Sequence, residues 1–179
     1  MGALWICVAS AACAGGATTA AGVEFTPDDA QAFDNAVDFI DKPAIVESEW
    51  RGDFESRVTR SDGIAIIRVT SISGDKDRRG SGYRLTVEVT EVLEGALPTE
   101  IVLRVHDDEP GFRSVQANED RLLGGSFVTF VKWQANEGSG GPIPRWHLSP
   151  NSAAVREKVR FFSNPPPGDD RTQVEVVSP

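Results

Sequence analysis

The feature that most constrains the fold is a strict alternation of apolar and polar side chains in the middle of the chain. Over positions 83–90, Tyr83, Leu85, Val87 and Val89 alternate with charged or hydroxyl-bearing residues. Successive side chains of a β-strand point to opposite faces of its sheet, so this period of two predicts a strand with one dry and one wet face. Such a strand has to bury its dry face against other elements of the fold.

Other segments have the composition of short strands. They are residues 64–72, 101–105, 127–133 and 145–148. Residues 127–133 are apolar at both alternating sets of positions, which is typical of a central strand. The connectors at 75–82 and 94–98 are too short for the crossover helix that parallel neighbouring strands require. The sequence therefore predicts a mainly β domain, a small barrel or sandwich of about five strands.

Helices are expected at both ends of this β region. Thr26 and Pro27 are typical of a helix start, and Phe33, Val37 and Ile40 would then share one apolar face until Lys42-Pro43 ends the helix. Residues 44–60 fit either a short strand around Ile45 followed by an irregular link, or a helical link. Near the C-terminus, Ser152 can cap a helix in which Val155, Val159 and Phe162 share a face.

Three segments resemble parts of bacterial exported domains of OB-like, netrin-like or metalloproteinase-inhibitor-like build. They are Ser61-Asp62-Gly63-Ile64-Ala65-Ile66-Ile67-Arg68-Val69, Val87-Glu88-Val89-Thr90-Glu91-Val92-Leu93-Glu94-Gly95 and Leu123-Gly124-Gly125-Ser126-Phe127-Val128-Thr129-Phe130. The resemblance implies a five-stranded OB-like Greek-key barrel used for binding, here flanked by the N- and C-terminal helices. Inhibitors of that build use an N-terminal cysteine and several disulfides. The only cysteines here are Cys7 and Cys13, so protease inhibition does not carry over.

The N-terminus is typical of an export signal. Before Glu24 there is no charged side chain, and residues 3–13 form an apolar run that is too short to span a membrane. Small residues suit cleavage after Ala14 or Ala21, and Ser10-Ala11-Ala12-Cys13 resembles a lipobox that would place a lipid on Cys13. No Lys or Arg precedes the run, so an Ala-rich tail on a cytosolic protein is the alternative. We expect a leader at 1–22, a single domain at 24–162 and a disordered Pro-rich tail at 163–179.

Charge and motifs limit the choice of partner and cofactor. The chain carries 18 Lys and Arg against 27 Asp and Glu, a net charge of −9, which disfavours nucleic acid. A lipid on Cys13 is the membrane contact that we expect. Gly138-Ser139-Gly140-Gly141 opens no helix and is interpreted as a flexible loop rather than a phosphate loop, and no cofactor is expected.

Catalytic and metal-binding interpretations rest on few residues. His106-Asp107-Asp108-Glu109 could hold Ca²⁺ through its carboxylates, or be a solvated acidic loop that protects an edge strand. His147 alternates with Trp146 and Leu148 and is expected to point into solvent. Ser126 lacks the closing glycine of a nucleophile elbow. We therefore assign no catalytic and no metal-binding residue. A hydrolase using His106 with a nearby carboxylate is the alternative.

Binding residues are expected at two places. Trp133 and Trp146 end two neighbouring strands and would form either core or, if exposed together, an aromatic anchor for a ligand. Arg156 and Arg160 stand one turn apart in the basic C-terminal helix and would contact a partner, dock on the acidic barrel or face water. The tripeptide Arg51-Gly52-Asp53 is interpreted as a chance match.

These observations together favour an exported, non-enzymatic binding module of a bacterial cell envelope. It would be periplasmic, anchored at the outer membrane or secreted, and its ligand would be a protein or a glycan. A hydrolase and a structural subunit of an envelope assembly are the alternatives.

Overall fold

The computed structural model describes residues 25–40, 47–77, 79–136 and 141–165. Its strands are β1 (Ala36–Val37), β2 (Gly63–Asp77), β3 (Gly80–Gly95), β4 (Glu100–His106), β5 (Ser126–Gln134) and β6 (Ile143–Pro150). Its helices are α1 (Pro27–Ala32), α2 (Glu47–Arg60), α3 (Phe112–Gln116), α4 (Glu119–Leu122) and α5 (Ala153–Ser163). The expected leader at 1–22 and the tail beyond residue 165 lie outside the described residues.

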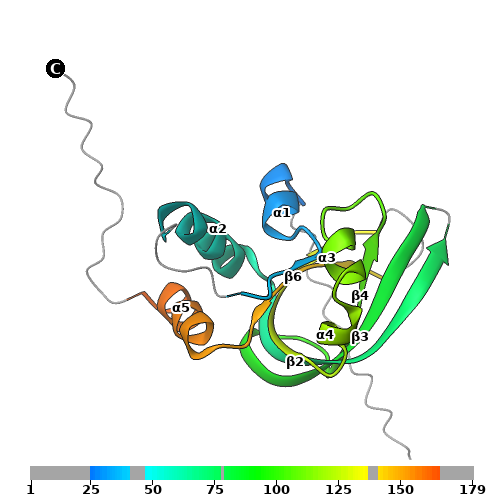
Figure 1. Cartoon of the computed structure of the whole chain (residues 1–179). Coiled ribbons are helices and arrows are strands. Elements are labelled where there is room, and N and C mark those ends of the chain that lie inside the picture. Colours follow the sequence, from blue (N-terminus) through cyan, green and yellow to red (C-terminus); the bar gives the residue numbers. More distant parts are fainter. Residues whose placement is uncertain (1–24, 41–46, 78, 137–140, 166–179) are drawn as a thin grey trace, which may run out of the picture.

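The strands form one sheet that curls into a half-barrel (Figure 1). Its order is β1-β6-β5-β2-β3-β4, so the expected mainly β class is confirmed, but the sheet has six strands rather than five. The additional strand is the two-residue β1, which pairs in parallel with β6 through Ala36–His147 and Val37–Leu148. The other neighbouring strands are antiparallel, as short connectors require.

The alternating segment lies in β3 with its apolar side chains on the inner face of the curl. Leu85 and Val87 are fully buried, and Tyr83 and Val89 pack against the same cluster. β4 contributes alternate buried residues to it in the same way, and α3 and α4 add Val115 and Leu122. The expected turn at 75–82 is shorter than predicted because β2 and β3 remain paired as far as Asp77 and Gly80.

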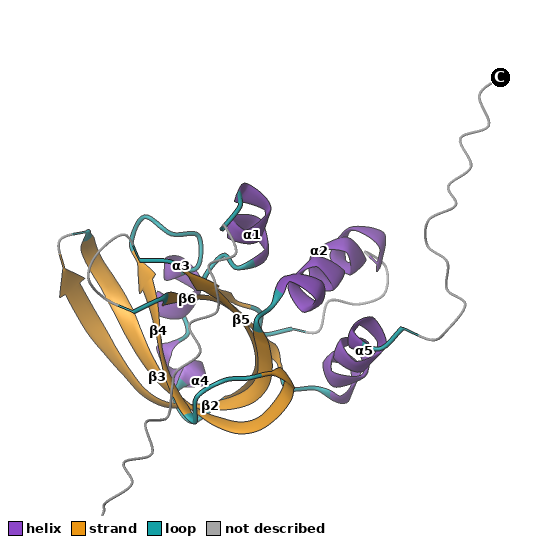
Figure 2. Cartoon of the chain, turned by 180° about the vertical axis from the view of Figure 1, so that it is seen from behind, coloured by secondary structure: helices purple, strands orange, loops and turns teal. Residues whose placement is uncertain are grey.

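A second core lies on the outer face of β2 and β5, under α1, α2 and α5 (Figure 2). Phe130 of β5 meets Phe54 of α2 with ring centroids 5.4 Å apart, and Phe54 also contacts Phe162 of α5. Val128 faces this outer core, whereas Phe127 and Val131 face the inner one. β5 is therefore buried on both faces, which explains its continuous apolar sequence.

The expected N-terminal helix is shorter than its apolar spacing suggested. Thr26 caps α1 as predicted, but the helix ends at Ala32, and Asn35 follows in a left-handed conformation with a φ of 55°. The Asn35 amide donates to the Trp146 carbonyl at 2.8 Å, which ties this segment to β6 instead of continuing the helix. Val37 consequently lies in a strand, and Ile40 is 73% exposed.

Other segments follow the prediction in part. Ser152 caps α5, because its side chain accepts a hydrogen bond from the Val155 amide. The acidic segment His106-Asp107-Asp108-Glu109 is followed by α3 and α4 before β5 begins. The ambiguous segment 44–60 contains α2, and Arg51-Gly52-Asp53 lies inside that helix rather than at a turn.

Candidate functional site

The mouth pocket lies where the curled sheet fails to close, between the edges of β4 and β6. Its volume is about 380 Å³. The described residues that line it come from the β2–β3 hairpin, β4, β6 and the segments beside them. They are Asn35, Asp77, Arg79, Arg84, Val102, Arg104, His106, Glu109, Asn136, Pro142, Ile143, Pro144 and Arg145.

The sequence of β6 explains why the barrel stays open here. The backbone of Trp146 faces away from β5, since its carbonyl accepts from Asn35 and its amide donates to the Asn35 side chain at 3.1 Å. Pro144 shares this parity in β6, and Pro142 shares it just before the strand begins. Neither proline has an amide proton to offer β4. The two edges are joined instead by the Trp146 indole, whose Nε1 donates to the Arg104 carbonyl at 2.9 Å.

Glu109 anchors the floor of the mouth pocket. Its Oε2 accepts from the His106 amide and from Asn35 Nδ2, each at 2.9 Å, and its Oε1 accepts from Arg145 Nη1 at 2.5 Å. Burial alone raises the pKa of Glu109, but these donors outweigh burial and hold the pKa below its usual value. Glu109 is therefore a fixed counter-ion that joins the loop after β4 to β1 and β6.

Two arginines face each other on the outer face of the pocket wall. Arg84 of β3 and Arg104 of β4 are directly paired in the antiparallel register, an arrangement that is unfavourable for like charges. Both guanidinium groups approach one carboxylate, with Nε to Asp75 Oδ2 distances of 3.9 Å for Arg84 and 3.6 Å for Arg104. These distances are too long for hydrogen bonds, so one carboxylate only partly compensates two cations.

The remaining charged groups of the pocket balance each other. Arg79 lies 3.4 Å from Asp108 Oδ2 and 3.5 Å from Glu109 Oε1. His106 Nε2 lies 3.7 Å from Asp77 Oδ2. The backbone amide of Arg79, first among several donors and charges, holds the pKa of Asp77 below its usual value. Arg104 also contributes to this lowering of the Asp77 pKa. Of the pocket arginines, Arg84 and Arg104 have the longest contacts with a carboxylate.

His106 and Ser126 do not form a catalytic pair. His106 lies opposite Gly82 near the tip of the hairpin, whereas Ser126 lies opposite Arg68 in the first half of β2 and accepts from Asn151 at 2.9 Å. Among the described residues that line the mouth pocket there is no Ser, Thr or Cys. The geometry supplies a histidine beside a carboxylate, and the described pocket wall supplies no hydroxyl or thiol nucleophile for a triad.

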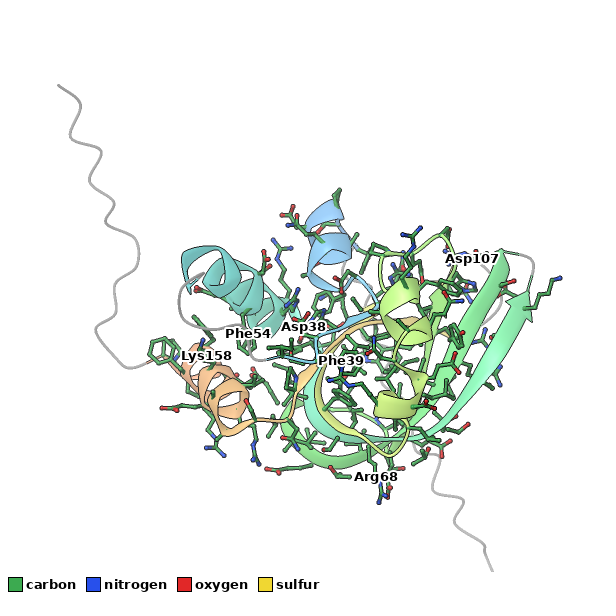
Figure 3. All side chains as sticks on the ribbon, in the orientation of Figure 1. Asp38, Phe39, Phe54, Arg68, Asp107 and Lys158 are labelled. Atoms are coloured by element: carbon green, nitrogen blue, oxygen red, sulfur yellow. The ribbon has the colours of Figure 1, made fainter. Side chains whose placement is uncertain are left out.

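The segment 106–109 does not form a cation cage. Glu109 points inward to Arg145, while Asp107 lies on the exposed end of the sheet (Figure 3). In the described ranges no three His, Cys, Asp or Glu side chains lie close enough together to hold a metal ion. The other alternative, a solvated acidic loop, describes only part of the segment, since Glu109 is only 9% exposed.

Trp133 and Trp146 belong to the core and do not form an exposed aromatic anchor. Trp146 is fully buried, so it presents no surface to a ligand, and Trp133 packs half-buried against the inner core. In α5, Arg156 is half-buried and Arg160 is exposed, on the helix that covers the outer core rather than on a pocket wall. Cys13 lies outside the described residues.

The expectation that His147 points into solvent is wrong. Its side chain does point opposite to Trp146, but it lies on the outer face of the sheet, which the helical layer of α1, α2 and α5 covers, and it is only 1% exposed. Nδ1 lies 2.9 Å from Asp34 Oδ1 and Nε2 lies 3.3 Å from Asp38 Oδ2. The alternation was read correctly, but the outer face of β6 is covered in this part of the sheet.

Sequence reasoning missed Arg84, Arg104 and Arg145 as site residues. The signal was present for two of them, since Arg84 and Arg104 occupy wet-face positions of predicted strands. What the sequence does not contain is the register that sets them opposite each other.

The comparisons with protein-family models, curated proteins and solved structures find no match. Within the described residues, no helix has the length and apolar character needed to cross a membrane.

Proposed function

We propose that this protein is an exported, non-enzymatic binding module of a bacterial cell envelope, and that it holds a protein or glycan ligand in the mouth pocket. The observation that carries the proposal is the facing pair Arg84 and Arg104 with its single shared carboxylate. An anionic group of a ligand would supply the charge-assisted hydrogen bonds that Asp75 is too far away to make. The ligand is accordingly one that carries a carboxylate or a comparable anion.

The OB-like interpretation supports the same place. With β1 set aside, β2 to β6 form an antiparallel set of five strands, with α3 and α4 between the third and the fourth. Barrels of OB-like build bind ligands on the face of their second and third strands and between the loops after the first and fourth. These positions correspond to β3, β4, the β2–β3 turn and the β5–β6 connection, all of which contribute described residues to the mouth pocket.

A titration with two anionic probes tests the binding proposal. The probes are an oligogalacturonate and a peptide of alternating Val and Glu with blocked ends. We expect at least one of them to shift the NMR signals of Arg84, Arg104 and Arg145. The double variant Arg84→Gln/Arg104→Gln should weaken that binding by about tenfold or more, since two charge-assisted contacts are lost.

Arg68→Gln is the matched control. Arg68 is an exposed strand arginine that lies away from the pocket at the bottom of the sheet (Figure 3), so its replacement should leave binding unchanged. An equal loss in the control, or shifts that avoid the mouth pocket, would refute the proposed site. Cleavage of either probe would instead favour the hydrolase, for which the His106–Asp77 contact is the supporting geometry.

Export is tested by mass spectrometry of the protein isolated from its native cells. Cleavage after Ala14 or Ala21 supports a signal peptide at 1–22, and a diacylated Cys13 supports outer-membrane or other lipid anchoring. A chain that retains Met1 would contradict export through this leader.

A further inference from the structure

The exposed edge of β4 offers backbone groups to a further strand. β4 ends the sheet, and within the described residues it pairs with β3 alone. The Asp107 amide donates to β3, so the groups of the even-numbered residues face away from β3. Of these, the His106 amide donates to Glu109 and the Arg104 carbonyl accepts from Trp146. The amide and carbonyl of Val102 and the amide of Arg104 face the mouth pocket.

The opposite wall cannot offer backbone donors to this edge. Pro142 and Pro144 remove the donors that β6 would need in order to close the barrel against β4. The open seam between β4 and β6 therefore keeps an unpaired strand edge, which natural proteins usually block with proline, charge or a covering element. Here the proline protection is on β6 and leaves β4 open.

The side chains beside this edge define what would fit. Val102 and Ile143 are exposed apolar residues, 37% and 39% respectively, on the two sides of the seam. A residue directly opposite Arg104 on an added strand would lie about 4.5–5.5 Å away on the same face. A carboxylate at that position would lie beside Arg104, whose guanidinium shares Asp75 with that of Arg84, and an apolar residue two positions along would lie beside Val102.

We propose that the ligand of the mouth pocket is an extended acidic segment of a partner protein, which adds to the edge of β4 as a strand. This inference rests on the proposed function and narrows its ligand to a peptide. Backbone hydrogen bonds to Val102 and Arg104 would provide affinity, and the pairing of an acidic side chain with Arg84 and Arg104 would set the register. A glycan could satisfy the arginines but lacks the repeating amide and carbonyl groups that match a strand edge.

The test uses the full chain and three probes. They are the blocked Val–Glu peptide, the same peptide N-methylated at the alternate amides that would face β4, and the oligogalacturonate. We expect the unmodified peptide to slow hydrogen exchange at the amides of Val102 and Arg104, and the N-methylated peptide to bind at least about tenfold more weakly, because its donors are removed.

Variants of the edge provide the second readout. Val102→Pro removes an amide that faces the pocket and keeps the pairing of β4 with β3, so it should weaken peptide binding by at least about fivefold. Val102→Thr keeps the amide and the β-branched shape and should bind within about twofold of the natural chain. If Val102→Pro does not fold, the comparison of the two peptides carries the test.

The outcomes separate this inference from the proposed function. If the oligogalacturonate binds at the mouth pocket and the peptide does not, the proposed function stands and the strand addition is overturned. If neither binds, both fall. If Val102 and Arg104 are already protected in the free chain, the edge is occupied by the chain's own C-terminal segment or by a second copy, and a partner peptide is overturned.

Discussion

The two halves of β2 belong to one continuous strand and lie in opposite environments. Residues 63–69 are buried except for Arg68, whereas residues 70–77 are all exposed or half-buried. The first half pairs with β5 on one side and β3 on the other, and it is covered by the inner core and the helical layer. The second half pairs with β3 alone and extends with it as an arm beyond the body of the molecule (Figures 1 and 2).

This difference separates stability from the proposed binding within one strand. Apolar burial on both faces concentrates folding free energy in the first half, because stabilisation follows the apolar area removed from water. The arm has little such area, and it contributes Asp75, Asp77 and the turn residue Arg79 to the pocket wall or its rim. The residues that β2 contributes to the proposed site thus lie on the half of the strand where substitutions cost the fold least.

The largest loss of stability should come from a substitution in the part of the sheet that is buried on both faces. Phe130→Ala removes a fully buried ring that contacts Phe54 and leaves a cavity between β5 and α2. We expect a loss of about 3–5 kcal/mol in the free energy of unfolding, measured by urea denaturation. Ile72→Ala in the arm is the comparison, and since Ile72 is only half-buried its loss should be about 1 kcal/mol. Equal losses at the two positions would show that the arm carries as much folding energy as the body.

A smaller effect is expected at the floor of the pocket. Glu109→Gln removes the counter-ion of Arg145, whose side chain is 17% exposed. Breaking a fully buried pair costs about 3–5 kcal/mol, so we expect about 2–3 kcal/mol for this partly exposed one. Asp108→Asn is the control, because Asp108 is exposed and its contact with Arg79 is long.

The Glu109 effect should depend on pH. Since the folded-state pKa of Glu109 lies below its usual value of 4.5, its stabilisation is fully present above that value. It is lost as the pH falls through the lower pKa of the folded state. Unfolding free energies of the natural chain and of Glu109→Gln should therefore converge over the pH interval below 4.5. A difference that stays constant over that interval would show that the Glu109 carboxylate is not held in its charged form.

The elements with a regular period were predictable, and the contacts between them were not. The alternation at 83–90 and the continuous apolar run at 127–133 identified β3 and β5 because side-chain direction follows directly from strand geometry. The spacing of Phe33, Val37 and Ile40 predicted a helix that does not form, because Asn35 turns the chain and β6 pairs with the segment that follows. Tertiary hydrogen bonds overrode a local helical pattern.

The candidate site depends on register, which local patterns do not contain. Arg84 and Arg104 were predicted to be on wet faces, but their opposition arises from the pairing of β3 with β4. Trp146 was correctly predicted to lie in a strand, but its burial depends on a tertiary contact, because its indole spans the gap between β6 and β4 to reach the Arg104 carbonyl. Glu109 was grouped with its sequence neighbours, and it does accept from the His106 amide, but two of its other partners, Asn35 and Arg145, lie far away in the chain.

The smallest effect concerns the helical layer that makes the first half of β2 differ from the arm. Ser152→Ala removes the side chain that caps α5 through the Val155 amide, and we expect a loss of about 1 kcal/mol. Ser152→Asp keeps a capping acceptor and should restore most of that loss. Hydrogen exchange at Ile64 and Phe130, which lie in strands under this layer, should become faster in Ser152→Ala, while exchange in the arm should not change. Faster exchange at both places would show that the layer and the arm unfold as one unit, and that the contrast between the halves of β2 is one of exposure and not of local stability.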